Sequence, residues 1–204
     1  MGLREQKKQA TRAALSWAAI QLAVKRGFDN VLVEDIASAA GVSPRTFNNY
    51  FSSKAEAVAA RHLDRSAKMA DELRERPAGE PLWTSIRHAL LAQLEPGPEV
   101  VEHPVGDRDR WAAGVTALMT TPSMQAEILR AGALAEAEIA AAIAQRTGTV
   151  VGRDLYPSLV AAVVNAANNA CQQHYIRNDA KVDVKRVMIE ALDLVEAGLP
   201  DPSA

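Results

Sequence analysis

Four polar side chains lie within five consecutive positions, and their types match the exposed edges of DNA bases. They are Arg45, Thr46, Asn48 and Asn49, with the apolar Phe47 between them. Arginine can donate two hydrogen bonds to guanine, asparagine can pair with adenine, and the threonine methyl group can contact thymine. A short helix that buried Phe47 and turned the other four outward would read bases. In the alternative interpretation, the same residues are the water-facing side of a helical hairpin.

The residues before this segment have the pattern of a helix-turn-helix. Gly41 can adopt the left-handed conformation that a steep turn between two short helices requires. Ser43 is placed to cap the second helix, with Pro44 at its first position. The spacing therefore predicts helices at about 33–40 and 44–50, crossing at this turn.

Candidate phosphate contacts surround the predicted base-reading helix at 44–50, which we call the reader. Residues 1–54 contain eight basic and four acidic residues, whereas the rest of the chain contains fifteen basic and twenty-one acidic residues, for a net charge of -2. Basic side chains and helix ends both attract the phosphates of DNA. The candidates are Arg4, Lys7, Lys8, Ser43, Tyr50 and Lys54. For the basic stripe near the N-terminus, a solvated helix face is the alternative.

The elements that position these residues are expected to be helical throughout. The 204 residues are 48% hydrophobic, 24% charged and 4% aromatic, with abundant alanine and no sustained alternation of apolar and polar residues. This composition favours an all-α globular protein. Nine helices are predicted, at about 3–26, 33–40, 44–50, 54–76, 82–95, 108–120, 122–147, 154–178 and 183–197. Ser53 and Glu56 form a capping-box pattern at the start of the fourth.

Several function classes are excluded by what the sequence lacks. Cys171 is the only cysteine, which leaves no disulfide framework and no cysteine-rich zinc site. The four histidines are dispersed, and the sequence contains no nucleophile elbow, phosphate-binding loop, dinucleotide-binding glycine motif or zinc-protease motif. We expect no enzyme activity, no metal and no cofactor. The sequence also lacks an apolar run that could span a membrane and a signal peptide, so a cytoplasmic protein without a membrane partner is expected.

The N-terminal quarter resembles the TetR family of bacterial transcriptional regulators. The matching segments are Ala18–Leu22, Arg26–Phe28, Val33–Ala37, Ala40–Ser43, Tyr50–Phe51 and Ser53–Lys54. The resemblance implies a DNA-binding domain at 1–53 and a helical ligand-binding and dimerisation domain at 54–204. Leu32 departs from the pattern, because the family usually has a threonine there that caps the next helix.

The resemblance further implies a homodimer held by the last two long helices, at 154–178 and 183–197. Their apolar residues could form this interface or an ordinary intramolecular core. The interface candidates are Leu159, Val163, Val184, Val187, Met188, Ala191, Leu192 and Val195.

A small-molecule effector site is implied in the same domain. The candidates combine large apolar residues with amides in an apolar helix: Met69, Trp83, Ile86, Leu90, Trp111, Val115, Met119, Asn165, Asn168 and Gln172. For each apolar residue, plain core is the alternative. The amides, if buried, must find partners either across the dimer axis or on a ligand.

The function implied is a ligand-responsive regulator, most typically a repressor released from a palindromic operator in double-stranded DNA by a small, largely apolar effector. The layout also resembles a TetR subgroup that binds acyl-CoA-like ligands. An activator, or a helical protein-interaction module of the same fold, is the alternative.

Overall fold

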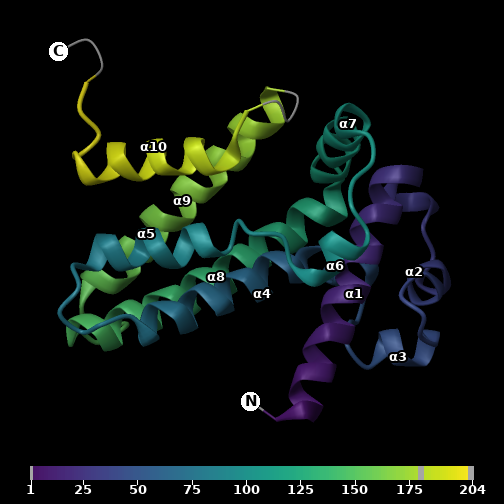
Figure 1. Cartoon of the computed structure of the whole chain (residues 1–204), viewed down its shortest axis with the longest axis horizontal. Helices are drawn as coiled ribbons and strands as arrows, with labels where there is room; N and C mark the ends of the chain where they lie inside the picture. Colours follow the sequence, from purple (N-terminus) through teal and green to yellow (C-terminus); the bar gives the residue numbers. More distant parts are fainter. Residues whose placement is uncertain (1, 179–181, 202–204) are drawn as a thin grey trace. The chain divides into compact units, whose positions relative to one another are not determined.

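The computed structural model describes residues 2–178 and 182–201, and in this part all regular secondary structure is helical (Figure 1). The α-helices are α1 (Leu3–Arg26), α2 (Val33–Ala39), α3 (Pro44–Asn48), α4 (Lys54–Glu75), α5 (Leu82–Ala92), α6 (Pro98–Glu102), α7 (Arg108–Met119), α8 (Pro122–Thr147), α9 (Leu155–Arg177) and α10 (Val184–Glu196). A single 3-10 turn, η1 (Phe28–Asn30), follows α1. The predicted all-α class is confirmed. Within the described ranges, no helix has the length and apolar content needed to cross a bilayer.

The prediction of nine helices missed α6 and extended α5 too far. α6 has five residues, with Pro98 at its first position, and is too short to show a helical repeat in the sequence. α5 ends at Ala92, three residues before the predicted end, and a turn at Gln93 closes it. The predicted Gly27 stop is confirmed: this residue has a φ of 83° and donates its N–H to the carbonyl of Ala23 at 2.9 Å.

The chain forms two compact units. The first contains residues 1–63 and 96–131, and the second contains 64–95 and 132–204. These units do not divide the chain at 53/54, since α6, α7 and the start of α8 belong with the N-terminal helices. The functional division at 1–53 and 54–204 stays a prediction.

The first unit is built on α1, against which α2, η1, α6 and α7 pack. Its core contains Leu15, Ala19, Val31, Ile36, Phe47, Phe51, Leu118 and Met124. α7 crosses α1 closely at Gly114. A Cβ atom at that position would lie 2.6 Å from the carbonyl oxygen of Val24, so a larger residue would force the two helices apart.

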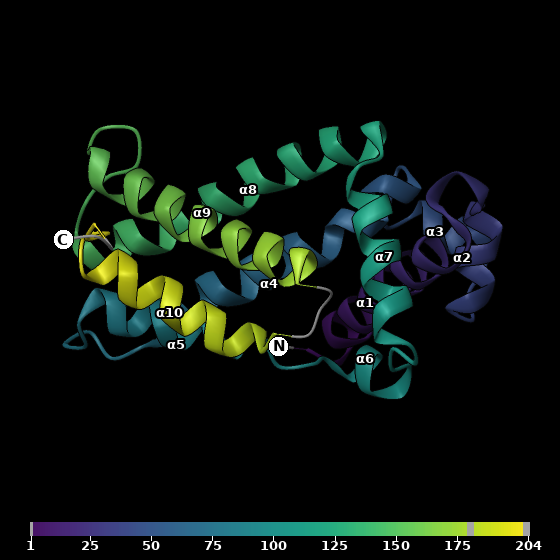
Figure 2. The same ribbon diagram turned by 90° about the horizontal axis from the view of Figure 1, so that it is seen from above.

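The second unit joins the later part of α4 to α5, α8, α9 and α10. Figure 2 shows α9 beside α10, with α5 along the other side of α10. Its core contains Met69, Leu73, Ile86, Ile143, Val164, Met188 and Leu192. The turn between α4 and α5 is held by Arg146 of α8, whose guanidinium donates to the carbonyls of Arg76, Pro77 and Glu80 at 2.6–3.0 Å.

Candidate nucleic-acid interface and the cavity beside it

The turn between α2 and α3 has the geometry that the sequence predicts. Gly41 has a φ of 67°, and Val42 donates its N–H to the carbonyl of Ala37 at 2.9 Å. The hydroxyl of Ser43 accepts the N–H of Thr46 at 3.1 Å, which caps α3, and Pro44 occupies the first helical position. A local hydrogen-bonded turn and cap therefore set the direction in which α3 leaves α2.

The inner face of α3 is a single aromatic anchor. Phe47 is 0% exposed, and its ring centroid lies 5.6 Å from that of Phe51 in the core of the first unit. Arg45, Asn48 and Asn49 are exposed. In the described part of the chain, none of these three side chains has a hydrogen-bond partner, so their donors and acceptors face solvent.

Thr46 differs from the other predicted base readers. It is half-buried, and its hydroxyl lies 2.9 Å from the hydroxyl of Ser43, so that group belongs to the cap of α3. The methyl group is the part of Thr46 that keeps the predicted chemistry, since a methyl–methyl contact with thymine needs no hydroxyl.

The phosphate candidates on α1 are free to meet a polyanion. Arg4, Lys7 and Lys8 are all exposed on its first two turns. Tyr50 is half-buried beyond α3. Its carbonyl accepts a hydrogen bond of 3.5 Å from the guanidinium of Arg12, which also lies 4.7 Å from the centre of the Phe51 ring.

Lys54 needs a correction. Its ammonium group donates to the carbonyls of Phe28, Val31 and Asp29 at 2.7, 3.0 and 3.4 Å, and it lies 4.5 Å from the centre of the Phe28 ring. An ammonium group has three protons, and three carbonyls of the protein accept hydrogen bonds from it here. Lys54 therefore anchors the segment between α1 and α2 rather than presenting its charge to a phosphate.

One of the two hydrogen bonds of the predicted capping box at the start of α4 is present. Ser53 accepts the N–H of Glu56 at 3.1 Å, as predicted. The Glu56 carboxylate, however, accepts from the N–H and hydroxyl of Ser52 at 2.8 and 2.6 Å, one residue earlier than expected. Burial alone would raise the pKa of Glu56, but the Ser52 bonds and the nearby Arg130 and Arg12 outweigh it and lower the pKa below its ordinary value.

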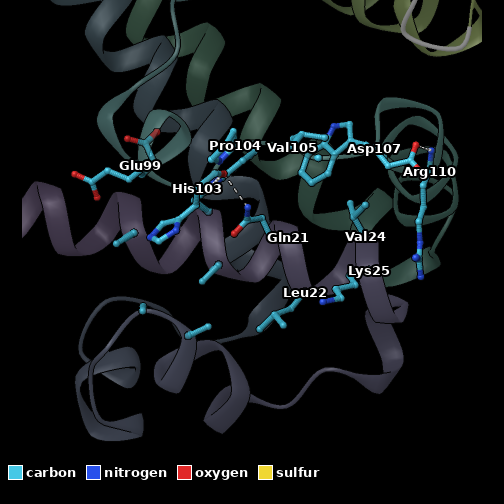
Figure 3. A pocket seen from close by; sticks show the side chains of 18 residues that line it. Gln21, Leu22, Val24, Lys25, Glu99, His103, Pro104, Val105, Asp107 and Arg110 are labelled. Carbon is cyan, nitrogen blue, oxygen red and sulfur yellow. Dashed lines mark hydrogen bonds between the residues drawn. The ribbon is translucent and has the colours of Figure 1, made fainter.

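A cavity of about 690 Å³ opens in the first unit between α1, the end of α2 and the segment from α6 to α7 (Figure 3). Its lining combines apolar residues of α1 with Pro104, Val105 and Trp111. Trp17 and Trp111 pack with ring centroids 5.3 Å apart. The sequence did not single out this site, because its wall on α1 and its wall at residues 99–111 are more than seventy residues apart in the chain.

The wall formed by residues 103–107 is attached to α1 through one carbonyl. His103 accepts the indole N–H of Trp17 and the side-chain amide of Gln21, both at 3.0 Å. The guanidinium of Arg61 lies 5.0 Å from the centre of the Trp17 ring and pairs with Glu99 at 2.6 Å. Figure 3 shows the bond from Gln21 to His103 inside the cavity.

The predicted effector residues are not gathered at this cavity. Trp111 lines it, whereas Met69, Ile86 and Leu90 are buried in the core of the second unit and Trp83 packs against that core. Val115 and Met119 are half-buried on α7. Of the predicted amides, Asn165 and Asn168 are half-buried on α9, and Gln172 is exposed.

The predicted dimer interface is wrong for Met188 and Leu192, which lie in the core of one chain. Met188 and Leu192 are each 1% exposed and form part of the core of the second unit, against which Val187 and Ala191 also pack. Met188 and Leu192 therefore have almost no surface left for a second chain, whereas Val187 and Ala191 stay partly exposed and remain interface candidates. Val163, Val184 and Val195 are half-buried, and Leu159 is 51% exposed. Exposed apolar residues that were not predicted accompany it: Leu155, Tyr156, Ile189 and Leu194.

Residues 17–60 match the family model for bacterial regulatory proteins of the tetR family, and residues 80–200 match the model for the MftR C-terminal domain. The chain is 32% identical over 197 residues to the HTH-type transcriptional regulator TcmR of Streptomyces glaucescens, covering 94% of this chain and 85% of TcmR. It is 30% identical over 198 residues to MftR of Mycobacterium tuberculosis, predicted to regulate mycofactocin biosynthesis, covering 95% and 93%.

A solved structure shares the fold. FadR of Thermus thermophilus, a TetR family transcriptional repressor in complex with lauroyl-CoA, superposes with a TM-score of 0.54 at 19% identity, covering 95% of this chain and 97% of that chain. At this identity, the likeness concerns the arrangement of helices.

Proposed function

Because the chain belongs to the TetR family of bacterial transcriptional regulators, we propose that it is a ligand-responsive repressor that binds a palindromic operator through α3. Its relatives regulate transcription and are not enzymes. The observation that carries the proposal is the division of α3 into two faces: Phe47 is fully buried, while Arg45, Asn48 and Asn49 point their polar groups to solvent.

The polar face of α3 carries groups that can hydrogen-bond to base edges, and the apolar face holds the helix in place. Arg45 has two parallel donors for guanine, and Asn48 and Asn49 each offer a donor and an acceptor for adenine. Because α3 is short and anchored from behind by one ring, it can enter the major groove without exposing apolar surface. The reader begins at the capped N-terminus of α3, where helix-turn-helix proteins place their base contacts.

Affinity for the backbone is assigned to the exposed cations of α1. Arg4, Lys7 and Lys8 supply charge that releases counterions from DNA regardless of sequence. The hydroxyl of Ser43 is exposed and already ordered by its bond to the N–H of Thr46. Phosphate contacts of this kind hold the reader in register but do not choose the bases.

A homodimer supplies the second reader. TetR family regulators act as dimers, and one reader covers only half of an operator. We assign the interface to the outward faces of α9 and α10, which carry the exposed residues Leu155, Leu159, Ile189 and Leu194. Exposed apolar residues on neighbouring helices are typical of such interfaces.

The effector is proposed to be small and largely apolar, with release from the operator as its result. The Thermus FadR neighbour was solved with lauroyl-CoA, and acyl-CoA-like compounds are therefore the first class to screen.

A protein that binds operator DNA functions where the nucleoid lies, so the proposed location of this one is the bacterial cytoplasm.

Selection of bound oligonucleotides by the purified protein tests the proposal. We expect enrichment of an inverted repeat whose half-sites lie about one helical turn, ~34 Å, or a multiple of it apart. Enrichment of a single asymmetric site would contradict the dimeric reader. Absence of any enriched sequence, with the protein folded, would contradict the regulator itself.

A further inference from the structure

We propose that the cavity of the first unit is an effector site and that its ligand is an amphipathic organic anion. The inference rests on the proposed function, because it names where an effector of that regulator binds. It differs from the effector site predicted from the sequence, because the candidates Met69, Ile86 and Leu90 are packed into the core of the second unit. A volume of about 690 Å³ lies within the range of pockets that hold drug-sized molecules.

Apolar side chains of the cavity form a preformed surface for the apolar part of the ligand. Trp17, Leu22, Val105 and Trp111 line the cavity, and the two indoles are in direct contact. The bonds from Trp17 and Gln21 to the His103 carbonyl hold the loop that carries Val105. Because this wall is fixed before a ligand arrives, little ordering has to accompany binding.

The charges around the cavity favour an anion at one end. Figure 3 shows Glu99 and His103 at one end of the site, and Lys25 and Arg110 at the other. Glu99, already neutralised by Arg61 at 2.6 Å, lies on α6, and so does Glu102, which also lines the cavity. Throughout the described part of the chain, neither Lys25 nor Arg110 forms an ion pair.

One carboxylate also lies at the cationic end. Asp107 accepts the main-chain N–H of Arg110 at 3.0 Å as the cap of α7. Two cations against one carboxylate leave this end with an excess of positive charge. Lys25 and Arg110 can therefore bind the head group of an anion whose apolar body covers the indoles.

The position of the cavity gives a direct route to the DNA reader. Ala39 and Ala40 line it at the end of α2, and Gly41 of the turn follows immediately. α3 begins at Pro44, so a ligand pressing on Ala40 acts on the turn that directs the reader. The ligand changes DNA affinity to the extent that it binds the two arrangements of this turn unequally.

Titration of the DNA-free protein with 8-anilinonaphthalene-1-sulfonate, an aromatic anion whose fluorescence rises in apolar sites, tests the binding. In the double variant Lys25→Gln/Arg110→Gln, we expect the dissociation constant to rise about threefold to tenfold, because two exposed ionic contacts are lost. Lys68→Gln, an exposed lysine of α4 outside the cavity, is the matched control and should bind like wild type. Equal affinities of the double variant and the control would overturn the assignment.

Energy transfer from tryptophan to the bound dye shows which unit holds the dye. The chain has three, of which Trp17 and Trp111 line the cavity and Trp83 packs against the core of the second unit. Energy transfer from tryptophan to the dye should fall in Trp111→Phe and persist in Trp83→Phe. Loss of transfer in Trp83→Phe alone would place the dye in the second unit and overturn the proposal.

The effector role is tested on an oligonucleotide that the protein selects. Saturating dye should weaken DNA binding by about fivefold or more, as expected for allosteric coupling, and the double variant should need proportionally more dye. Unchanged DNA affinity at saturating dye would overturn the effector role. If the protein selects no DNA, the proposed function fails, while the dye titration still decides whether the cavity binds anions.

Discussion

The indole N–H of Trp17 donates to the main-chain carbonyl of His103 at 3.0 Å, which joins α1 to a loop 86 residues later in the chain. The same carbonyl accepts the amide of Gln21, so the loop between α6 and α7 is held at one point by two side chains of one helix. This attachment shapes the cavity, and the Trp17 ring also contacts Trp111 and the guanidinium of Arg61.

Replacing Trp17 should loosen this loop. Trp17→Phe keeps a ring against Arg61 but removes the N–H donor, and we expect the free energy of unfolding to fall by at least ~0.5–1.5 kcal/mol, the contribution of a typical hydrogen bond. Urea denaturation measures the change. Trp83→Phe is the control, since it removes an indole from the edge of the other core. A loss in Trp17→Phe no greater than in this control would show that the bond contributes nothing.

Arg45 and Lys8 should differ in how they affect DNA binding. Arg45→Ala should cost ~1–3 kcal/mol on the selected operator and relax the preference at one base position, because a two-donor contact is lost. Lys8→Ala should weaken all sequences alike and reduce the slope of log affinity against log salt by about one. Fluorescence anisotropy at several salt concentrations distinguishes the two. The assignment of the reader is wrong if Arg45→Ala leaves operator affinity unchanged.

Gly41 should tolerate a side chain poorly because of its backbone and not because of crowding. A Cβ atom there would meet nothing within 4 Å, but the φ of 67° is one that side chains disfavour. Gly41→Ala should lower the free energy of unfolding by ~1–2 kcal/mol and weaken operator binding.

Gly79 offers a matched control, since its Cβ position is equally open and its φ is not positive. Gly79→Ala should be neutral or slightly stabilising by thermal denaturation. Equal effects at the two glycines would show that the conformation of the turn is not the source of the cost.

Glu80 should make the stability of the second unit depend on pH. Hydrogen bonds from Arg76 and Ser85 lower the pKa of Glu80 to about 2. A carboxylate with a lowered pKa adds stability that is complete above its unfolded value of 4.5 and is lost as the pH falls toward 2. The melting temperature of Glu80→Gln should therefore be below that of wild type at neutral pH and approach it at acid pH. A difference that stays constant from pH 7 to pH 2.5 would contradict the role of this carboxylate.

The dimer assignment predicts that a charge at Leu159 shifts the oligomeric state. Leu159→Glu should raise the dimer dissociation constant at least tenfold, because a carboxylate would be buried without a partner. Val151→Glu, at 48% exposure in the turn before α9, is a control of matched exposure and should remain dimeric. Analytical ultracentrifugation measures both, and a dimeric Leu159→Glu protein would move the interface elsewhere.

Much of the first unit could be predicted because its determinants act within one or two helical turns. The glycine turn at Gly41, the Ser43 cap and the burial of Phe47 follow from local conformational preference and the helical repeat, and each is present in the structure. The same holds for the end of α1 at Gly27. The five-residue α6 was missed because it shows less than two turns of pattern and, unlike the equally short α3, has no side-chain cap.

The sequence by itself determined the helices, the turn and the family, since these depend on neighbouring residues and on recurring local patterns. Only the tertiary structure decided which partners distant groups would meet. Carbonyls more than twenty residues earlier in the chain hold the ammonium of Lys54, and Met188 turned inward to a core shared with α5 and α8. The carbonyl of His103 likewise found its donors on α1. A charge or an apolar face does not specify its own partner, because that choice depends on how segments far apart in the chain pack together.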